Sequence, residues 1–129
     1  MIKQEMKFKD FNGVERKEDF WFHLSQAEIM DFNLTTPGGL EAMIQNIVDA
    51  QDIPSLIAMF KKIILMSVGK KSADGRNFVK NQEIIDDFTS TNAYSDLYMS
   101  LITDSDKAVK FINGILPDMS NVPQIEANN

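Results

Sequence analysis

Hydrophobic and polar residues alternate near the start of the chain, and a turn sequence divides this alternating stretch in two. Asn12 and Gly13 are the strongest short-range signal of a tight hairpin, because both residues accept positive φ angles at low cost. Residues 5–24 are therefore predicted to form a β-hairpin. Its second arm is apolar on both faces near the end, which predicts that the helical body or a partner covers each face.

The following residues change to the helical period. Ser25 and Glu28 form a capping box, which predicts a short helix that runs to about Phe32. Capping residues and apolar spacing predict further helices at roughly 40–50, 53–68, 82–88, 93–102 and 105–115.

Two segments interrupt or end the helical pattern. Gly69 is placed to close the preceding helix in a left-handed conformation. Residues 70–81 are polar, with Phe78 and Val79 able to pin this loop or to form a short strand. Residues 118–129 carry few large apolar groups and are predicted to be a flexible tail. The expected fold class is thus α+β and predominantly helical: an N-terminal β-hairpin and about six helices in one domain, residues 1–117.

Composition narrows the function classes. The chain has 129 residues, 43% of them hydrophobic, which suits one globular domain. A formal net charge of −6 disfavours nucleic acid and bare membrane as partners. The absence of cysteine excludes disulfides and thiolate chemistry, and suits a reducing cytoplasm. No secretory signal or membrane-spanning run is evident at the sequence level.

The sequence carries little that resembles an active site. His23 is the sole histidine, and no nucleophile motif accompanies it. Asp52 and Asp104 are explained as helix caps, and no calcium-loop or phosphate-loop spacing occurs. We therefore predict no catalytic residue, no metal site and no cofactor.

Methionines on the predicted helices indicate an adaptable apolar surface, because methionine fits irregular partners. The hairpin aromatics could in turn contact another subunit. The candidate client-binding residues are Met43, Ile47, Met59, Phe60, Ile63 and Met66, and the candidate subunit-contact residues are Phe8, Phe20, Trp21 and Phe22.

Several segments, taken in order, resemble one family. They are Phe8–Arg16, Phe20–Leu24, Ala27–Glu28, Pro37–Leu40, Gly69–Lys80, Ala93–Leu97 and Phe111–Pro117. With these segments the chain resembles the tail assembly chaperones of long-tailed phages and prophages of Gram-positive bacteria. One departure is Val68, where an aromatic residue is expected in relatives.

The resemblance implies a non-enzymatic chaperone that binds the tape measure protein and keeps it soluble until the major tail protein polymerises. The major tail protein is a further candidate partner, and a homo-oligomer is expected. The implied location is the host cell cytoplasm and not the mature virion. Many family genes also make a longer, frameshifted form, which would extend from residues 118–129.

Two other functions stay open at this point. A structural virion subunit of the tail or connector would need more strand content for ring or tube formation. A small acidic inhibitor that mimics DNA would need acids arrayed along one face, whereas lysine and arginine are interspersed with them here.

Overall fold

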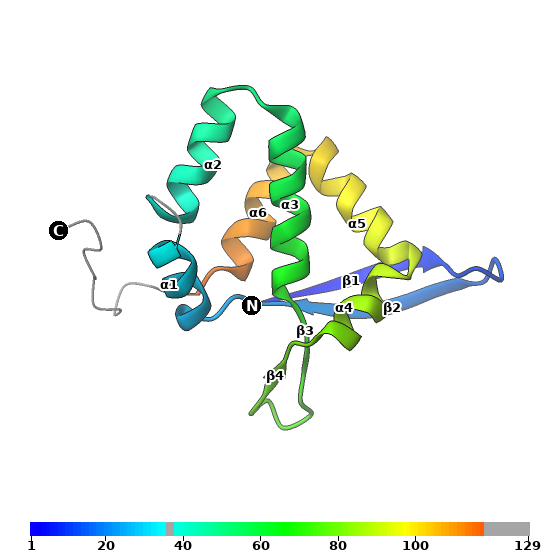
Figure 1. Ribbon diagram of the computed structural model, residues 1–129. Helices are drawn as coiled ribbons and strands as arrows, with labels where there is room; N and C mark the ends of the chain where they lie inside the picture. The colour runs from blue at the N-terminus through cyan, green and yellow to red at the C-terminus, as the bar shows by residue number, and fades with distance from the viewer. Residues whose placement is uncertain (36–37, 118–129) are drawn as a thin grey trace.

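The computed structural model describes residues 1–35 and 38–117, without the side chains of Glu41, Ile44, Ile47, Val48 and Ser105. In this part of the chain, two hairpins build one antiparallel sheet, and six helices gather on one side of it (Figure 1). The strands, in sheet order, are β1 (Ile2–Lys9), β2 (Glu15–Phe22), β3 (Val68–Lys71) and β4 (Phe78–Val79). The helices are α1 (Gln26–Thr35), α2 (Gly39–Asp49), α3 (Ile53–Ser67), α4 (Gln82–Thr89), α5 (Asn92–Thr103) and α6 (Ser105–Ile115). The predicted fold class, α+β and mostly helical, is confirmed.

The N-terminal hairpin forms with its turn at the predicted place. β1 and β2 pair antiparallel over their whole lengths. Gly13 has a φ of 79°, and Asp10 Oδ1 accepts the backbone N–H groups of Asn12 and Val14. Because a carboxylate at the turn accepts the backbone N–H groups of the turn, local residues alone fix its conformation. The hairpin extends well beyond the helices, with this turn at its far end (Figure 1).

The inward face of the hairpin supplies much of the core. Met6 and Phe8 of β1 and Phe22 of β2 are buried. The Phe22 ring packs edge-on against Phe88 of α4 and Phe111 of α6, with centroid distances of 5.6 and 5.1 Å. These aromatic contacts attach the hairpin to helices far along the chain, so the core depends on both.

The helix starts follow the capping pattern of the sequence. Glu28 N–H donates to Ser25 Oγ at 3.1 Å, and Ser25 N–H donates to Glu28 Oε1 at 2.9 Å, which is the predicted capping box. Asp52, Asn81 and Asp104 likewise accept backbone N–H groups of the helices that follow them. α1 ends at Thr35, about one turn later than predicted.

The end of α3 differs from the prediction. Gly69 does not end the helix in a left-handed conformation; Val68 is extended, with ψ at 136°, and the chain passes directly into β3. This glycine serves close packing, because a Cβ there would lie 2.5 Å from the Phe78 ring. Phe78 and Val79 form the short strand β4, so a second hairpin joins the sheet.

Residues 118–129, predicted to be a flexible tail, lie outside the described part of the chain. Among the described residues, no helix combines the length and the apolar character that crossing a membrane requires.

Candidate protein-binding surfaces

A groove with a volume of about 680 Å³ lies between α1, α3 and the start of α4. Ala58, Leu65 and Met66 of α3 and Ile85 of α4 line it with apolar surface. We call this the α3 groove. Its volume lies in the range of pockets that bind ligands or side chains of a partner.

One ion pair joins two walls of the α3 groove. Lys80 Nζ lies 2.7 and 2.8 Å from the two carboxylate oxygens of Glu28, and it also donates to the carbonyl oxygen of Met66 at 3.1 Å. Burial opposes the ionisation of Glu28, but hydrogen bonds from Lys80 and Ser25 outweigh it and hold the pKa of this carboxyl below its ordinary value. Glu28 is therefore ionised at neutral pH, and its charge is matched within the chain.

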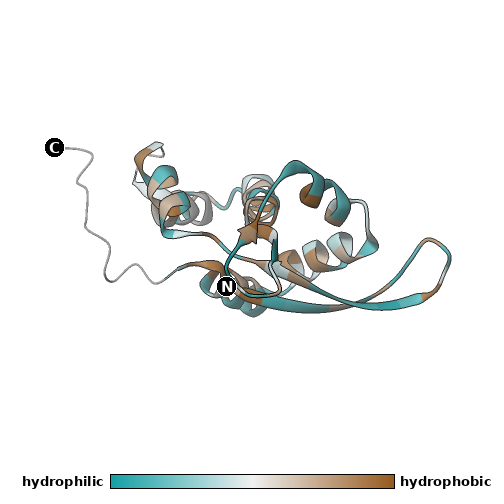
Figure 2. Cartoon of the chain, turned by 90° about the horizontal axis from the view of Figure 1, so that it is seen from below, coloured by the Kyte–Doolittle hydropathy of each residue, from teal (hydrophilic) through white to brown (hydrophobic). Residues whose placement is uncertain are grey.

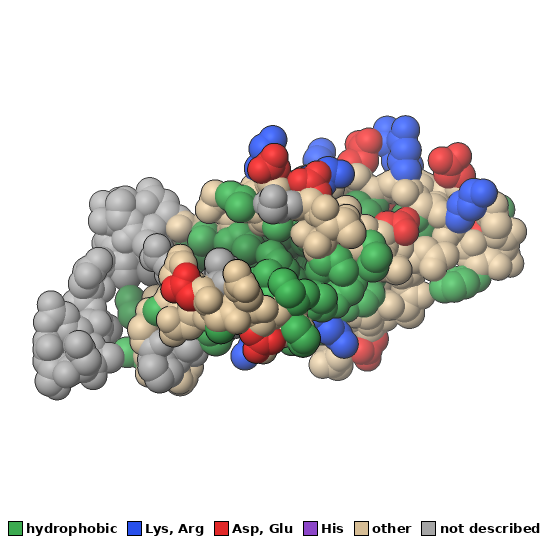
Figure 3. Space-filling model, turned by 90° about the horizontal axis from the view of Figure 1, so that it is seen from above, with side chains coloured by type: hydrophobic (Ala, Val, Ile, Leu, Met, Phe, Trp, Pro, Cys, Tyr) green, Lys and Arg blue, Asp and Glu red, His purple; other side chains and the backbone are tan. Residues whose placement is uncertain are grey.

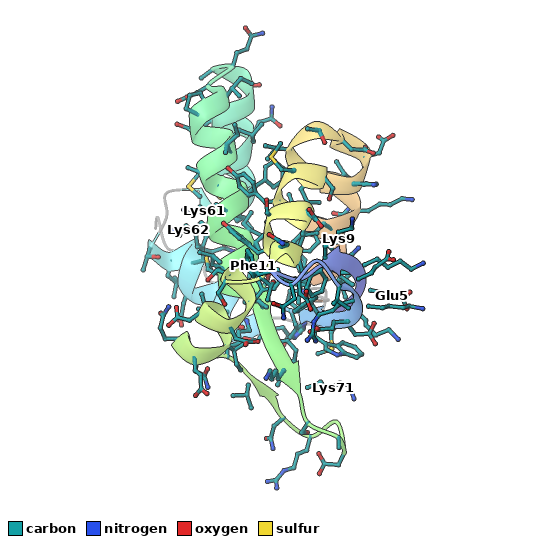
Figure 4. All side chains as sticks on the ribbon, turned by 90° about the vertical axis from the view of Figure 1, so that its right-hand side faces the viewer. Glu5, Lys9, Phe11, Lys61, Lys62 and Lys71 are labelled. Atoms are coloured by element: carbon teal, nitrogen blue, oxygen red, sulfur yellow. The ribbon has the colours of Figure 1, made fainter. Side chains whose placement is uncertain are left out.

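Two lysines at the rim of the α3 groove have no carboxylate within ion-pair distance among the described residues. They are Lys61 and Lys62, successive exposed residues of α3. Lys62 Nζ lies 5.5 Å from the centre of the Phe32 ring, a cation–π contact. Figure 4 shows both lysines on the side of the molecule away from Lys71 and Glu5 of the sheet. An apolar wall beside unmatched positive charge suits an amphipathic helix with acidic residues along its edge.

A second apolar area lies on the helical side of the molecule, away from the sheet. Figure 3 shows hydrophobic side chains gathered in the middle of this face, with charged side chains around the margin. α2 and α3 pack against each other, and their residues Met43 and Phe60 are half-buried.

The predicted client-binding residues do not share one environment in the structure. Met59 and Ile63 are 7% and 2% exposed and belong to the core of the chain itself. Met66 lines the α3 groove, and Met43 and Phe60 are half-buried. The side chain of Ile47 lies outside the described residues. The described members therefore do not form one continuous surface, because α3 turns some toward the core and one toward the groove.

The predicted subunit-contact residues lie on both faces of the sheet, because successive side chains of a strand point to opposite faces. Phe8 and Phe22 are buried, and Phe20 packs partly buried with its ring 4.9 Å from that of Phe88. Trp21 lies between Phe20 and Phe22 along β2, so its side chain lies on the opposite face of the sheet. Hydrophilic and hydrophobic segments follow one another along the hairpin (Figure 2). The three phenylalanines thus pack within the chain, and Trp21 alone among the four faces outward from the sheet.

Sequence reasoning missed two accessible features. Phe11 at the hairpin turn is 80% exposed, and the adjoining turn residues could have placed it at a tip. Lys61 and Lys62 of α3 mark the rim of the α3 groove, and no motif in the sequence indicates this role.

The side chain of His23 packs against a neighbouring aromatic ring. Its ring lies edge-on to that of Phe78, with a centroid distance of 5.8 Å. Burial, followed by the positive charges of the N-terminus and Lys80, lowers the pKa of His23, so the ring is neutral at pH 7. Among the described residues, no three His, Asp or Glu side chains come together as a metal site would require.

The described part of the chain therefore defines a mostly helical α+β protein with an apolar, lysine-rimmed groove. A family model with the description phage tail assembly chaperone matches residues 1–125. The chain belongs to this family of phage tail assembly chaperones, as its resemblance implies. Searches of curated proteins and of solved structures gave no significant match.

Proposed function

We propose that this chaperone binds and solubilises the tape measure protein during tail assembly, and that it does so without catalysis. The α3 groove is the observation that carries the proposal. Its apolar wall of Leu65, Met66 and Ile85 accepts the apolar face of an amphipathic client helix. Lys61 and Lys62 then meet acidic side chains at the edge of that helix.

Weak but repeated contacts suit such a chaperone. Apolar helical faces of a long client aggregate when they are exposed before assembly. A groove of this size covers only a short client segment, so one contact is readily released. Many copies along one client together hold it in solution, because linked weak contacts add to a high overall avidity. Polymerisation of the major tail protein would then displace the copies.

The proposal places the protein in the host cytoplasm and not in the finished particle. Mass spectrometry of purified virions, compared with infected-cell lysate, tests this part. Stoichiometric recovery of the chain in virions would favour a structural subunit of the tail instead.

Co-expression with the tape measure protein tests the function and the groove together. The variant Lys61→Glu with Lys62→Glu reverses the rim charges without changing the apolar wall. We expect the soluble yield of tape measure protein to rise with the wild-type chaperone and to fall by about tenfold with this variant, a loss typical of charged interface pairs.

The matched control is Lys107→Glu with Lys110→Glu on α6, which makes the same change in net charge at exposed positions away from the α3 groove. This control is expected to solubilise the client as the wild type does. Equal client solubility with and without the wild-type chaperone would refute the function. Equal loss for both double variants would refute the groove.

A further inference from the structure

Strand β1 forms an edge of the sheet, and in the described part of the chain it pairs with β2 alone. The hairpin turn shows which of its backbone groups this pairing uses. Asp10 N–H donates to the carbonyl oxygen of Val14 at 2.9 Å, and bonded pairs alternate with unbonded pairs along an antiparallel ladder. The even-numbered residues of β1 therefore bond to β2, and the odd-numbered residues direct their N–H and carbonyl groups out of the sheet.

Two further hydrogen bonds agree with this alternation. His23, directly after β2, donates its N–H to the carbonyl oxygen of Ser67 at 2.8 Å, so the odd-numbered side of β2 faces β3 and its even-numbered side faces β1. Asn92 of α5 donates from Nδ2 to the carbonyl oxygen of Lys9 at 2.8 Å. This odd-numbered carbonyl is thus directed outward, and a helix residue satisfies it at the end of β1.

The open part of this edge is residues 3–7, which we call the β1 edge. No described residue outside the hairpin bonds to the outward backbone groups of Lys3, Glu5 or Lys7. Their side chains are exposed, on the face opposite to the buried residues of β1. A row of unpaired N–H and carbonyl groups is a template on which an extended chain can add as a further strand.

Lysine side chains make the outer face of the β1 edge positive. Lys3 and Lys7 have no carboxylate within ion-pair distance among the described residues, and Glu5 between them is already paired with Lys17 at 3.1 Å. Full overlap with the same edge of another copy would place lysine opposite lysine and glutamate opposite glutamate, which is unfavourable. Acidic side chains at alternate positions of the added strand would instead match the lysines.

A pocket of about 220 Å³ lies on the helical side of this edge. Gln4 contributes to it from β1, and the buried Leu97, Leu101 and Phe111 give it an apolar wall from α5 and α6. Two exposed lysines of α6 also line it. Every second side chain of an added strand would point toward this pocket. Apolar residues between the acidic ones would therefore contact its wall.

We propose that the β1 edge binds an extended, acidic segment of a partner protein as a further strand, antiparallel to β1. Acidic residues at alternate positions of this segment lie beside Lys3 and Lys7, and the apolar residues between them face the pocket. Backbone hydrogen bonds supply affinity, and the charge pairs fix the register. This ligand is distinct from the client helix of the α3 groove, because strand addition requires an extended backbone.

A synthetic peptide of alternating glutamate and valine, capped at both ends and labelled with a fluorophore, is the probe for this edge. Fluorescence anisotropy measures its binding to the full-length protein in about 0.05 M salt. We expect saturable binding that weakens at least about tenfold for Lys3→Glu with Lys7→Glu. The matched control, Lys61→Glu with Lys62→Glu, makes the same change in net charge at the α3 groove and should bind the peptide like the wild type. Circular dichroism confirms that both variants are folded.

Methylation of the peptide nitrogens separates strand addition from simple charge attraction. Residues of a bonded antiparallel pair lie on the same face, so the glutamates opposite Lys3 and Lys7 direct their N–H groups at β1. Methyl groups on the glutamate nitrogens remove these donors and should weaken binding at least about tenfold. Methyl groups on the valine nitrogens, which face away from β1, should change the affinity little.

Three results would overturn the proposal. One is a wild-type protein that shows no saturable binding of the peptide. Another is an equal effect of the two methylation patterns, because binding would then not use the backbone of the edge. The third is an equal loss for both lysine double variants, because net charge and not the β1 edge would then govern binding.

Discussion

Lys80 and Glu28 are 52 residues apart in the chain, yet the Lys80 Nζ lies 2.7 Å from Glu28 Oε1. The pair joins the first turn of α1 to the residue just before the N-cap of α4, across the α3 groove. Glu28 also caps α1 through Ser25, so one carboxylate positions a helix start and a groove wall together.

Removal of this ion pair should destabilise the protein modestly. Lys80→Ala leaves Glu28 without its cation, and we expect the free energy of unfolding to fall by about 1 kcal/mol, since Glu28 is partly exposed and solvent screens its charge. Urea unfolding measures the change. The matched substitution Lys17→Ala breaks the more exposed ion pair with Glu5 and should cost less than about 0.5 kcal/mol. Equal losses would show that the groove pair has no special role.

Acidification should weaken the contribution of Glu28 to the stability of the fold. Its pKa in the folded protein lies below the ordinary value of 4.5, so its stabilising effect is complete above about pH 4.5. The effect is lost as the pH falls through the lowered folded-state pKa, where the folded protein takes up the proton. The difference in unfolding free energy between wild type and Glu28→Gln should therefore shrink as the pH falls from 7 to 3. A difference that stays constant over this range would contradict the ion pair.

The packing of the hairpin against its own helices can be tested by comparing substitutions of a buried and an exposed phenylalanine. Phe22→Ala empties a fully buried site between α4 and α6 and should cost about 3–5 kcal/mol of unfolding free energy. Phe11→Ala makes the same change at the exposed hairpin turn and should alter stability by less than about 0.5 kcal/mol. Chemical denaturation of dilute monomer compares the two. A small effect of Phe22→Ala would mean that this ring serves another subunit and not its own core.

The close packing of the second hairpin can be tested at Gly69. Alanine there would push against the Phe78 ring and the carbonyl oxygen of Val79, and we expect a loss of about 2 kcal/mol, typical of overpacking. Gly75→Ala meets no neighbouring atom but has a φ of 77°, so strain alone should cost about 1 kcal/mol. Hydrogen exchange should show faster opening of β4 only for the Gly69 variant. Unchanged exchange at β4 would contradict the packing account.

Local signals in the sequence were sufficient for much of the fold. Asn12 with Gly13, and Ser25 with Glu28, specify a turn and a helix start through bonds among neighbouring residues, and both appear where predicted. Gly69 could not be interpreted in this way. Its role depends on Phe78, which reaches it only after β3 and β4 have paired.

For a related reason, the sequence could not predict which residues of α3 face the core and which line the groove. This helix is apolar around most of its circumference, and its sequence does not say which side meets the core. Tertiary packing turns Met59 and Ile63 inward and leaves Leu65 and Met66 along the groove. The candidate site therefore depends on where α1 and α4 pack against α3. The spacing of apolar residues along a helix does not predict the positions of these neighbouring helices.

Photo-crosslinking in cells tests the client-binding role of the α3 groove most directly. A photoreactive amino acid replaces Leu65 in the groove or, as control, Met99, which is half-exposed on α5. Each chaperone is co-expressed with the tape measure protein and irradiated. We expect a crosslink to the tape measure protein from position 65 and little or none from position 99. Crosslinks of equal yield from both positions, or from position 99 alone, would contradict client binding in this groove.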